Sequence, residues 1–220
     1  MLRTSIVIDY QNVHLTAHDV FEPRGELHDA LVHPMQFARR AIEERNSRVR
    51  DGFALAKISR VLVFRGRPHV DHDSAQHRRC NDQAAQWQAD GALVELRDLK
   101  YKYKTINGTQ VPDGRPREKG IDVLCALACV RETTRPDIDL VILASRDTDL
   151  VPALDELYDF RGTDSQRYAM VETVAWFNSR WRDEATMSGG SLKPTEPRRI
   201  WNTNLNRECF ESSLDPNDYR

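Results

Sequence analysis

Apolar runs alternate with amphipathic stretches along most of this 220-residue chain. Short, largely β-branched runs are typical of buried strands. We expect five such strands, at Thr4 to Ile8, Arg60 to Phe64, Ala92 to Leu96, Leu140 to Ala144 and Val171 to Phe177. Helical patterning, with Gly91 closing one helix and Pro152 opening another, predicts four helices, at Pro34 to Arg45, Asp73 to Asp90, Ile121 to Glu132 and Leu150 to Phe160. This alternation predicts an α/β fold with three α/β/α layers and a mostly parallel central sheet.

The ordered alternation ends near residue 180, so we expect one domain over residues 1–180. Residues 181–199 contain Ser188-Gly189-Gly190-Ser191 and two prolines, which predict a flexible loop. Residues 200–220 are expected to add a last strand or helix that packs back on the domain. Inside the domain, Leu99 to Lys104 is expected to be extended, and Thr105 to Lys119 is expected to be a loop.

Composition limits the cellular compartment and the kinds of partner that we expect for the chain. The longest apolar run, Val123 to Val130, is too short for a membrane span, and no leader peptide precedes the first strand, so no membrane partner is expected. The four cysteines lack metal-binding or redox spacing, which favours a reduced cytoplasmic protein. With a net charge of -2, any nucleic-acid binding must come from a local basic patch. No pattern decides whether the chain forms a homo-oligomer.

Four aspartates stand at the ends of these elements: Asp9, Asp122, Asp147 and Asp149. Asp9 follows the first strand, Asp147 and Asp149 follow the fourth, and Asp122 opens the most apolar helix. Because ligands bind beyond the carboxyl ends of parallel strands, we expect these carboxylates to meet at one sheet edge. Carboxylate oxygens are preferred ligands of Mg²⁺ or Mn²⁺, and such ions acidify water and neutralise phosphate charge.

Each aspartate also has a structural explanation. Asp147 and Asp149 can cap the following helix, Asp122 can interact with its own helix dipole, and Asp9 can simply end a strand. Taken one at a time, these explanations suffice. A functional site is favoured by the combination, because independent structural roles would have to coincide at one edge.

Three segments together resemble the signature blocks of NYN domains, PIN-like nucleases of the LabA type. They are Ile8-Asp9-Tyr10-Gln11-Asn12-Val13, Lys119-Gly120-Ile121-Asp122-Val123 and Ser145-Arg146-Asp147-Thr148-Asp149-Leu150-Val151-Pro152. The resemblance covers about Ser5 to Phe177 and implies a PIN-like fold, dependence on Mg²⁺ or Mn²⁺, and cleavage of RNA. It also implies that Asp9, Asp122, Asp147 and Asp149 bind the metal, with Asn12 beside the first acid and Lys119 ahead of the second.

One position departs from the family pattern. The third block usually reads Ser-Gly-Asp-Ser-Asp, and Arg146 stands here in place of the glycine. Arginine lacks glycine's conformational freedom. It can bind a substrate phosphate, or it can obstruct the site.

The segment Arg97 to Lys119 has a net charge of +4, with seven basic residues against three acids. Lys100-Tyr101-Lys102-Tyr103-Lys104 alternates basic and aromatic residues, which would face opposite sides of a strand. A basic face next to an acidic site suits a nucleic-acid backbone, most simply single-stranded RNA. The alternative is an ordinary solvated loop. On the functional interpretation, the substrate-binding residues are Lys102, Lys104, Arg117, Lys119 and Arg146, with Arg65 and Arg67 as further phosphate contacts.

Three hypotheses follow. The first is a metal-dependent ribonuclease. The second is an RNA-binding adaptor with a degenerate metal site, motivated by Arg146. The third is a phosphohydrolase acting on small phosphate esters. The third fits less well, because the Asp-x-Asp pair follows the fourth strand instead of the first and because the long basic segment suggests a polymer.

Overall fold

A computed structural model describes residues 1–114, 116–178 and 191–219. Its centre is a six-stranded sheet in the order β3-β2-β1-β6-β7-β8, in which every neighbouring pair is parallel. The strands of this sheet are β1 (Leu2–Asp9), β2 (Ala56–Arg67), β3 (Leu93–Asp98), β6 (Leu140–Ala144), β7 (Met170–Trp176) and β8 (Asn202–Leu205). The predicted parallel α/β class is therefore confirmed.

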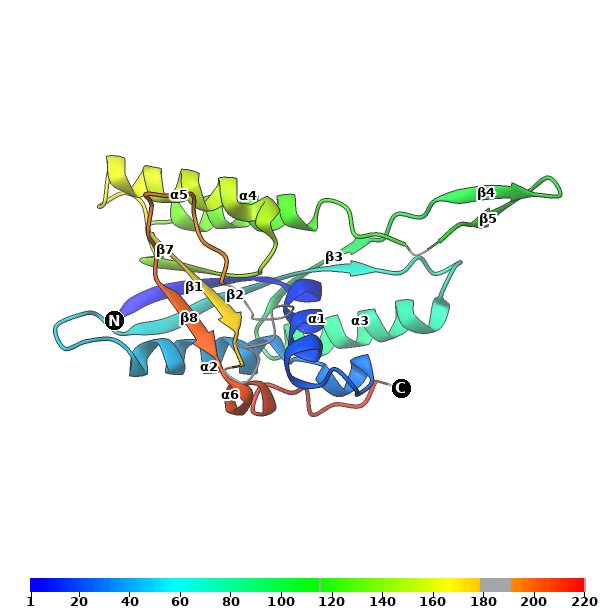
Figure 1. The fold of residues 1–220 in the computed structure, drawn as a ribbon, viewed down its shortest axis with the longest axis horizontal. Helices are drawn as coiled ribbons and strands as arrows, with labels where there is room; N and C mark the ends of the chain where they lie inside the picture. Colours follow the sequence, from blue (N-terminus) through cyan, green and yellow to red (C-terminus); the bar gives the residue numbers. More distant parts are fainter. Residues whose placement is uncertain (115, 179–190, 220) are drawn as a thin grey trace.

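Helices cover both faces of the sheet (Figure 1). On one face lie α1 (Tyr10–Phe21), α2 (Pro34–Ser47), α3 (Ser74–Ala89) and α6 (Arg207–Glu211), and on the other lie α4 (Ile121–Thr133) and α5 (Val151–Thr163). Along β1, Ile6 and Ile8 enter the first core cluster while Val7 enters the second. Because side chains alternate along a strand, one short apolar run supplies both cores and produces the three-layer arrangement.

The C-terminal segment completes the sheet. Both a strand and a helix form within Ile200 to Phe210, namely β8 and α6, and β8 pairs with β7 at the edge of the sheet. Of the expected flexible loop at residues 181–199, residues 181–190 lie outside the described part. Residues 191–199 contain no helix or strand.

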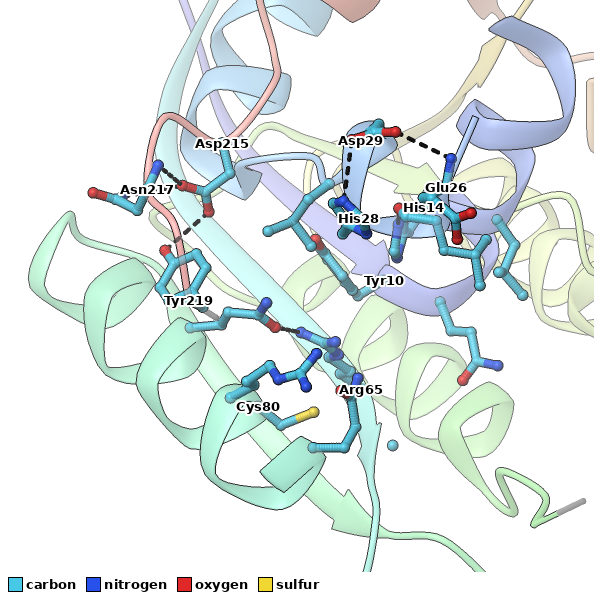
Figure 2. Close-up of a pocket in the computed structure, with 18 of the residues that line it drawn as sticks. Tyr10, His14, Glu26, His28, Asp29, Arg65, Cys80, Asp215, Asn217 and Tyr219 are labelled. Carbon is cyan, nitrogen blue, oxygen red and sulfur yellow. Dashed lines mark hydrogen bonds and ion pairs between the residues drawn. The ribbon is translucent and has the colours of Figure 1, made fainter. Parts of the chain in front are cut away.

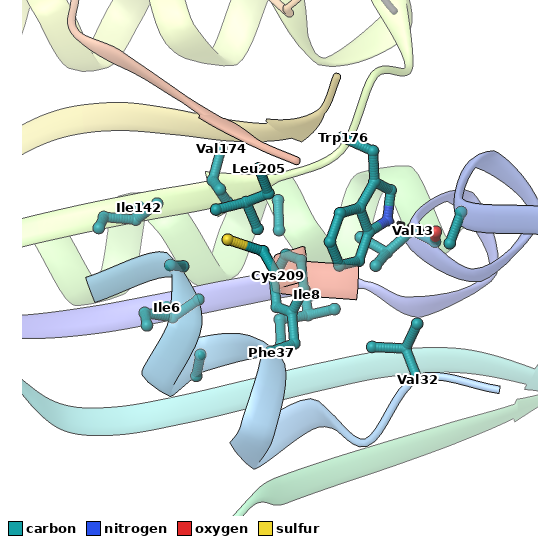
Figure 3. Close-up of a cluster of buried hydrophobic side chains, with 14 of the residues drawn as sticks. Ile6, Ile8, Val13, Val32, Phe37, Ile142, Val174, Trp176, Leu205 and Cys209 are labelled. Carbon is teal, nitrogen blue, oxygen red and sulfur yellow. Dashed lines mark hydrogen bonds between the residues drawn. The ribbon is translucent and has the colours of Figure 1, made fainter. Parts of the chain in front are cut away.

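The expected elements leave residues 10–33 unassigned, but α1 begins directly after β1. Its buried residues include Val13, Ala17 and Val20, which recur at helical spacing. In Figure 3, Val13 lies beside Trp176, whose indole N–H donates to the Val13 carbonyl over 2.9 Å. The polar residues after Asp9 suggest a catalytic segment, and that interpretation hides the helical spacing of the apolar residues in α1.

The expected loop from Thr105 to Lys119 is also corrected. Strands β4 (Tyr103–Ile106) and β5 (Thr109–Pro112) form an antiparallel hairpin that extends from the body of the domain beyond β3 (Figure 1). Asn107 and Gly108 have positive φ angles of 50° and 81°. A two-residue Asn-Gly turn with this backbone matches the twist of paired strands, so the same dipeptide that suggests a loop builds a hairpin. We call residues 100–117 the basic arm.

Two compositional expectations can be compared with the structure. All four cysteines are buried and free, and burial raises the pKa of each thiol. Within the described ranges, no helix combines the length and apolarity needed to cross a membrane.

Candidate functional site

The predicted acids lie where the order of the sheet reverses. From β1 the chain builds β2 and β3 on one side, and it later returns to build β6, β7 and β8 on the other. Asp9 is the last residue of β1, and Ser145 follows the end of the neighbouring strand β6. Such a reversal leaves a crevice at the carboxyl ends of the strands, which is the usual ligand site of an open parallel sheet.

Asp9 is the centre of this site and is only 5% exposed. One carboxylate oxygen accepts from the Ser145 hydroxyl over 2.9 Å, and the other caps α1 by accepting from the Asn12 backbone N–H at 3.4 Å. Burial, reinforced by the charges of Asp147 and Asp122 and opposed by the two hydrogen bonds, raises the pKa of Asp9 to about 6. The fold therefore brings Asp122 and Asp147 within electrostatic reach of Asp9.

The loop after β6 is held by its own hydrogen bonds. The Asn12 side-chain oxygen accepts the Arg146 backbone N–H over 2.9 Å, and the Asp147 N–H donates to the Ser145 hydroxyl over 3.1 Å. Asp147 also accepts the Asp149 N–H at 3.0 Å, which caps the short 3-10 helix Thr148–Leu150. The capping role proposed as the structural alternative is thus present at Asp147, although its charge also reaches Asp9. Asn12 positions the loop, and Asp149 is exposed.

Glu118 is an acid of this site that sequence reasoning missed. Its carboxylate accepts the backbone N–H of Gly66 at the end of β2. Burial, reinforced by the charge of Asp9 and opposed by the Gly66 hydrogen bond and the charge of Arg65, raises the pKa of Glu118 to about 7. A side-chain carbon at Gly66 would collide with this carboxylate and with Leu99, so a larger residue there would displace both side chains. The sequence offers one indication, because Glu118 directly precedes Lys119. In the segment Arg97 to Lys119, however, it counts only as one of the three acids that reduce the net positive charge.

The donor chemistry of this cluster suits Mg²⁺ or Mn²⁺, because every candidate ligand is a carboxylate. A cation would relieve the repulsion that raises the pKa of Asp9 and Glu118. Nevertheless, across residues 1–114, 116–178 and 191–219, no three His, Cys, Asp or Glu side chains are grouped closely enough to hold a metal ion. The carboxylates are instead turned toward hydrogen-bond donors of the protein, such as Ser145 and Gly66.

The predicted basic residues lie in two places. Lys119 is exposed three residues before Asp122, while Arg117 pairs through its backbone with Lys100, at 2.9 and 2.8 Å, and closes the base of the basic arm. Lys102 and Lys104 lie farther out along the arm, and Lys104 forms an exposed ion pair of 2.9 Å with Asp113. These two lysines belong to β4 and the segment before it, in the arm that extends away from the domain (Figure 1).

Arg146 is directed differently from the acids. Its half-buried side chain lines a small hollow together with Thr16 and Trp176. Burial lowers the pKa of Arg146, and the nearby charge of Asp19 opposes that shift. Arg146 thus lies toward α1 and β7.

Beside the acids lies a cavity of about 890 Å³ (Figure 2). Its walls come from α1, α3, the end of β2 and residues 214–219 near the C-terminus. Tyr10, which directly follows Asp9, lines it, as does Gly66, which bonds to Glu118. Arg65 reaches into the cavity from β2, while Arg67 is engaged by Asp98 at 2.8 Å and by Asn81 at 2.9 Å. The sequence places Arg65 near the site but does not predict a cavity, because its walls come from segments far apart in the chain, which also include residues 26–31.

Comparison with known proteins adds little. No protein-family model matches the chain, and no curated protein matches it. Among solved structures, the chain is similar to the crystal structure of a protein of unknown function from Vibrio parahaemolyticus. The match has 18% sequence identity and a TM-score of 0.42, and it covers 79% of this chain and 81% of that one. The NYN resemblance stays a prediction, and any function has to be argued from the site.

Proposed function

We propose that the chain is a metal-dependent ribonuclease that hydrolyses phosphodiester bonds of single-stranded RNA. The observation that carries the proposal is the position of Asp9, a buried carboxyl at the reversal point of the sheet that senses the charges of Asp122 and Asp147. A buried carboxylate near other acids is unfavourable unless a cation neutralises the charges. The resemblance of the same positions to NYN signature blocks supports this interpretation.

The residues of the chain then have distinct roles. Mg²⁺ or Mn²⁺ would be held by Asp9, Asp122, Asp147 and Asp149, with Glu118 as an added ligand, and would supply Lewis acidity to the phosphate and acidify a water. Ser145 and Asn12 orient Asp9 and the loop after β6 through the hydrogen bonds described above.

Substrate would be held by the basic side chains. Lys119 and Arg117 would neutralise phosphates close to the acids, and Lys102 and Lys104 on the basic arm would contact the strand farther along. Such contacts track the backbone without reading bases, so their contribution to affinity falls with salt.

A second candidate, from a different class, is a non-catalytic RNA-binding adaptor. The observation in its favour is that no three acids among the described residues are grouped to hold an ion. This function predicts salt-sensitive RNA binding without metal-dependent turnover.

Cleavage of labelled single-stranded RNA with Mn²⁺, with Mg²⁺ and with EDTA separates the two. We compare wild type, Asp147→Asn and a matched control, Asp51→Asn, at an exposed turn. Asparagine is also a good capping residue, so Asp147→Asn should fold and bind RNA. We expect cleavage that needs metal, is abolished by Asp147→Asn and is unchanged by Asp51→Asn. Full activity of Asp147→Asn would refute the assignment, and salt-sensitive binding without cleavage by wild type would favour the adaptor.

A further inference from the structure

The cavity beside the acids contains a buried cation. Arg65 is 8% exposed, and its guanidinium lies over the Tyr10 ring at 4.8 Å and near the Trp87 ring at 5.5 Å. Its only hydrogen-bond acceptor in the described residues is the Gln83 side-chain oxygen, shown as a dashed line in Figure 2. Among the described residues, no carboxylate forms a direct ion pair with Arg65, although its charge and that of Glu118 attract each other. A buried cation that no carboxylate contacts directly is unfavourable, so this side chain is suited to an anionic ligand.

Of the four acidic residues that line the same cavity (Glu26, Asp29, Asp215 and Asp218), Asp29 and Asp215 are held by groups other than Arg65. Asp215 accepts from the Trp87 indole over 2.8 Å and from the Tyr219 hydroxyl over 3.0 Å. Asp29 accepts the Glu26 N–H over 3.1 Å and lies 3.2 Å from a ring nitrogen of His28. Asp29 and Asp215 thus fasten the walls of the cavity (Figure 2), and within the described residues neither forms an ion pair with Arg65.

The location and the size of the cavity limit the kinds of ligand that it can bind. A cavity of about 890 Å³ is large enough for more than an inorganic anion. Two residues that line the cavity are next to the acids: Tyr10 directly follows Asp9, and Gly66 donates its N–H to Glu118. The exposed Arg79 also lines the cavity. A guanidinium is well matched to phosphate because its N–H groups can donate two parallel hydrogen bonds.

We propose that this cavity binds a phosphate group of a nucleotide, with Arg65 as the anchoring residue. If the proposed ribonuclease function holds, on which this part rests, the cavity takes a nucleotide neighbouring the bond that is cut. The phosphate can belong to an RNA strand or to a free mononucleotide, since the recognising chemistry is the same.

The test measures binding in EDTA, where metal-dependent cleavage is absent. The probes are a fluorescein-labelled single-stranded RNA of about ten nucleotides, read by anisotropy, and adenosine monophosphate, read by calorimetry. Arg65→Gln is compared with Lys57→Gln, which removes one positive charge from an exposed side chain at the opposite end of β2. We expect Arg65→Gln to weaken binding about tenfold to hundredfold, and Lys57→Gln to weaken it no more than about twofold.

Equal affinity of Arg65→Gln and wild type, or equal losses in the two variants, would overturn the proposal. Binding of both probes would mean that the cavity accepts a free nucleotide, whereas binding of RNA alone would mean that it needs the strand. If circular dichroism shows that Arg65→Gln does not fold, Arg79→Gln decides, because this exposed lining residue does not support the core. A loss of about threefold or more supports the proposal, and unchanged affinity refutes it.

The outcome is separable from that of the ribonuclease proposal. A wild type that cuts no RNA but needs Arg65 to bind it would refute the ribonuclease and keep the cavity. A wild type that cuts RNA while Arg65→Gln binds normally would do the reverse.

Discussion

Arg45 of α2 and Glu172 of β7 form an ion pair that connects the helical layer to the sheet. Both side chains are buried, at 7% and 8% exposed, and two parallel hydrogen bonds of 2.8 Å join them. Glu172→Gln keeps the shape of the side chain but removes its charge, which leaves a guanidinium buried without a counter-ion. We expect the free energy of unfolding to fall by about 3–5 kcal/mol, since breaking one partner of a buried pair leaves the other unpaired.

A loss of this size is a large share of the roughly 5–15 kcal/mol by which domains are stable. For a chain of this length it corresponds to a decrease in Tm of roughly 2–4 °C per kcal/mol. Urea unfolding followed by circular dichroism and by tryptophan fluorescence measures it, and coincidence of the two curves checks the two-state assumption.

Two controls make the measurement decisive. Asp159→Asn breaks the exposed pair between Asp159 and Arg198, at 51% and 27% exposed, and should cost less than about 1 kcal/mol. The double variant Arg45→Met, Glu172→Leu removes both charges and should recover most of the lost stability. If Glu172→Gln costs no more than Asp159→Asn, the reasoning about burial is wrong.

Two further predictions concern α1. Asn12→Ala leaves the Arg146 N–H without its acceptor and should lower the free energy of unfolding by about 1–3 kcal/mol. Ser47→Ala removes an exposed hydrogen bond to the Glu44 carbonyl and should cost less than about 1 kcal/mol, so equal losses in urea titrations would contradict the hydrogen-bond explanation. Burial lowers the pKa of His14 from 6.5 to about 4, so the unfolded state takes up a proton between these values and the native state does not. Its stabilising contribution is complete above pH 6.5 and is lost as the pH falls toward 4. Thermal melts from pH 7.5 to 4 should show a smaller loss of stability in His14→Gln, and parallel curves would refute the assignment.

Most of the fold is encoded locally. The run Leu140 to Ala144 is a strand with those bounds in the structure, because five consecutive apolar residues suit a strand buried on both faces. Helix α3 begins after Asp73 and ends before Gly91, as its capping residues predict, with Gly91 at a φ of 103°. The basic arm differs from the prediction, because its Asn107-Gly108 dipeptide is typical of a loop but forms the turn of a β-hairpin.

The candidate site also depends partly on the local sequence and partly on tertiary structure. From the sequence alone it followed that Asp9 and Asp147 would lie at one sheet edge, because the carboxyl ends of parallel strands share an edge and both acids follow strand patterns. Which carboxyls are buried together was decided by tertiary structure. Glu118 joins the site because its carboxylate reaches the backbone of Gly66 in β2, where a side chain would displace it. Arg65 is buried beside the site because α1, α3 and the C-terminal segment meet around it. Patterns along the chain determine which elements form, whereas a buried charge and a cavity depend on contacts between residues far apart in sequence.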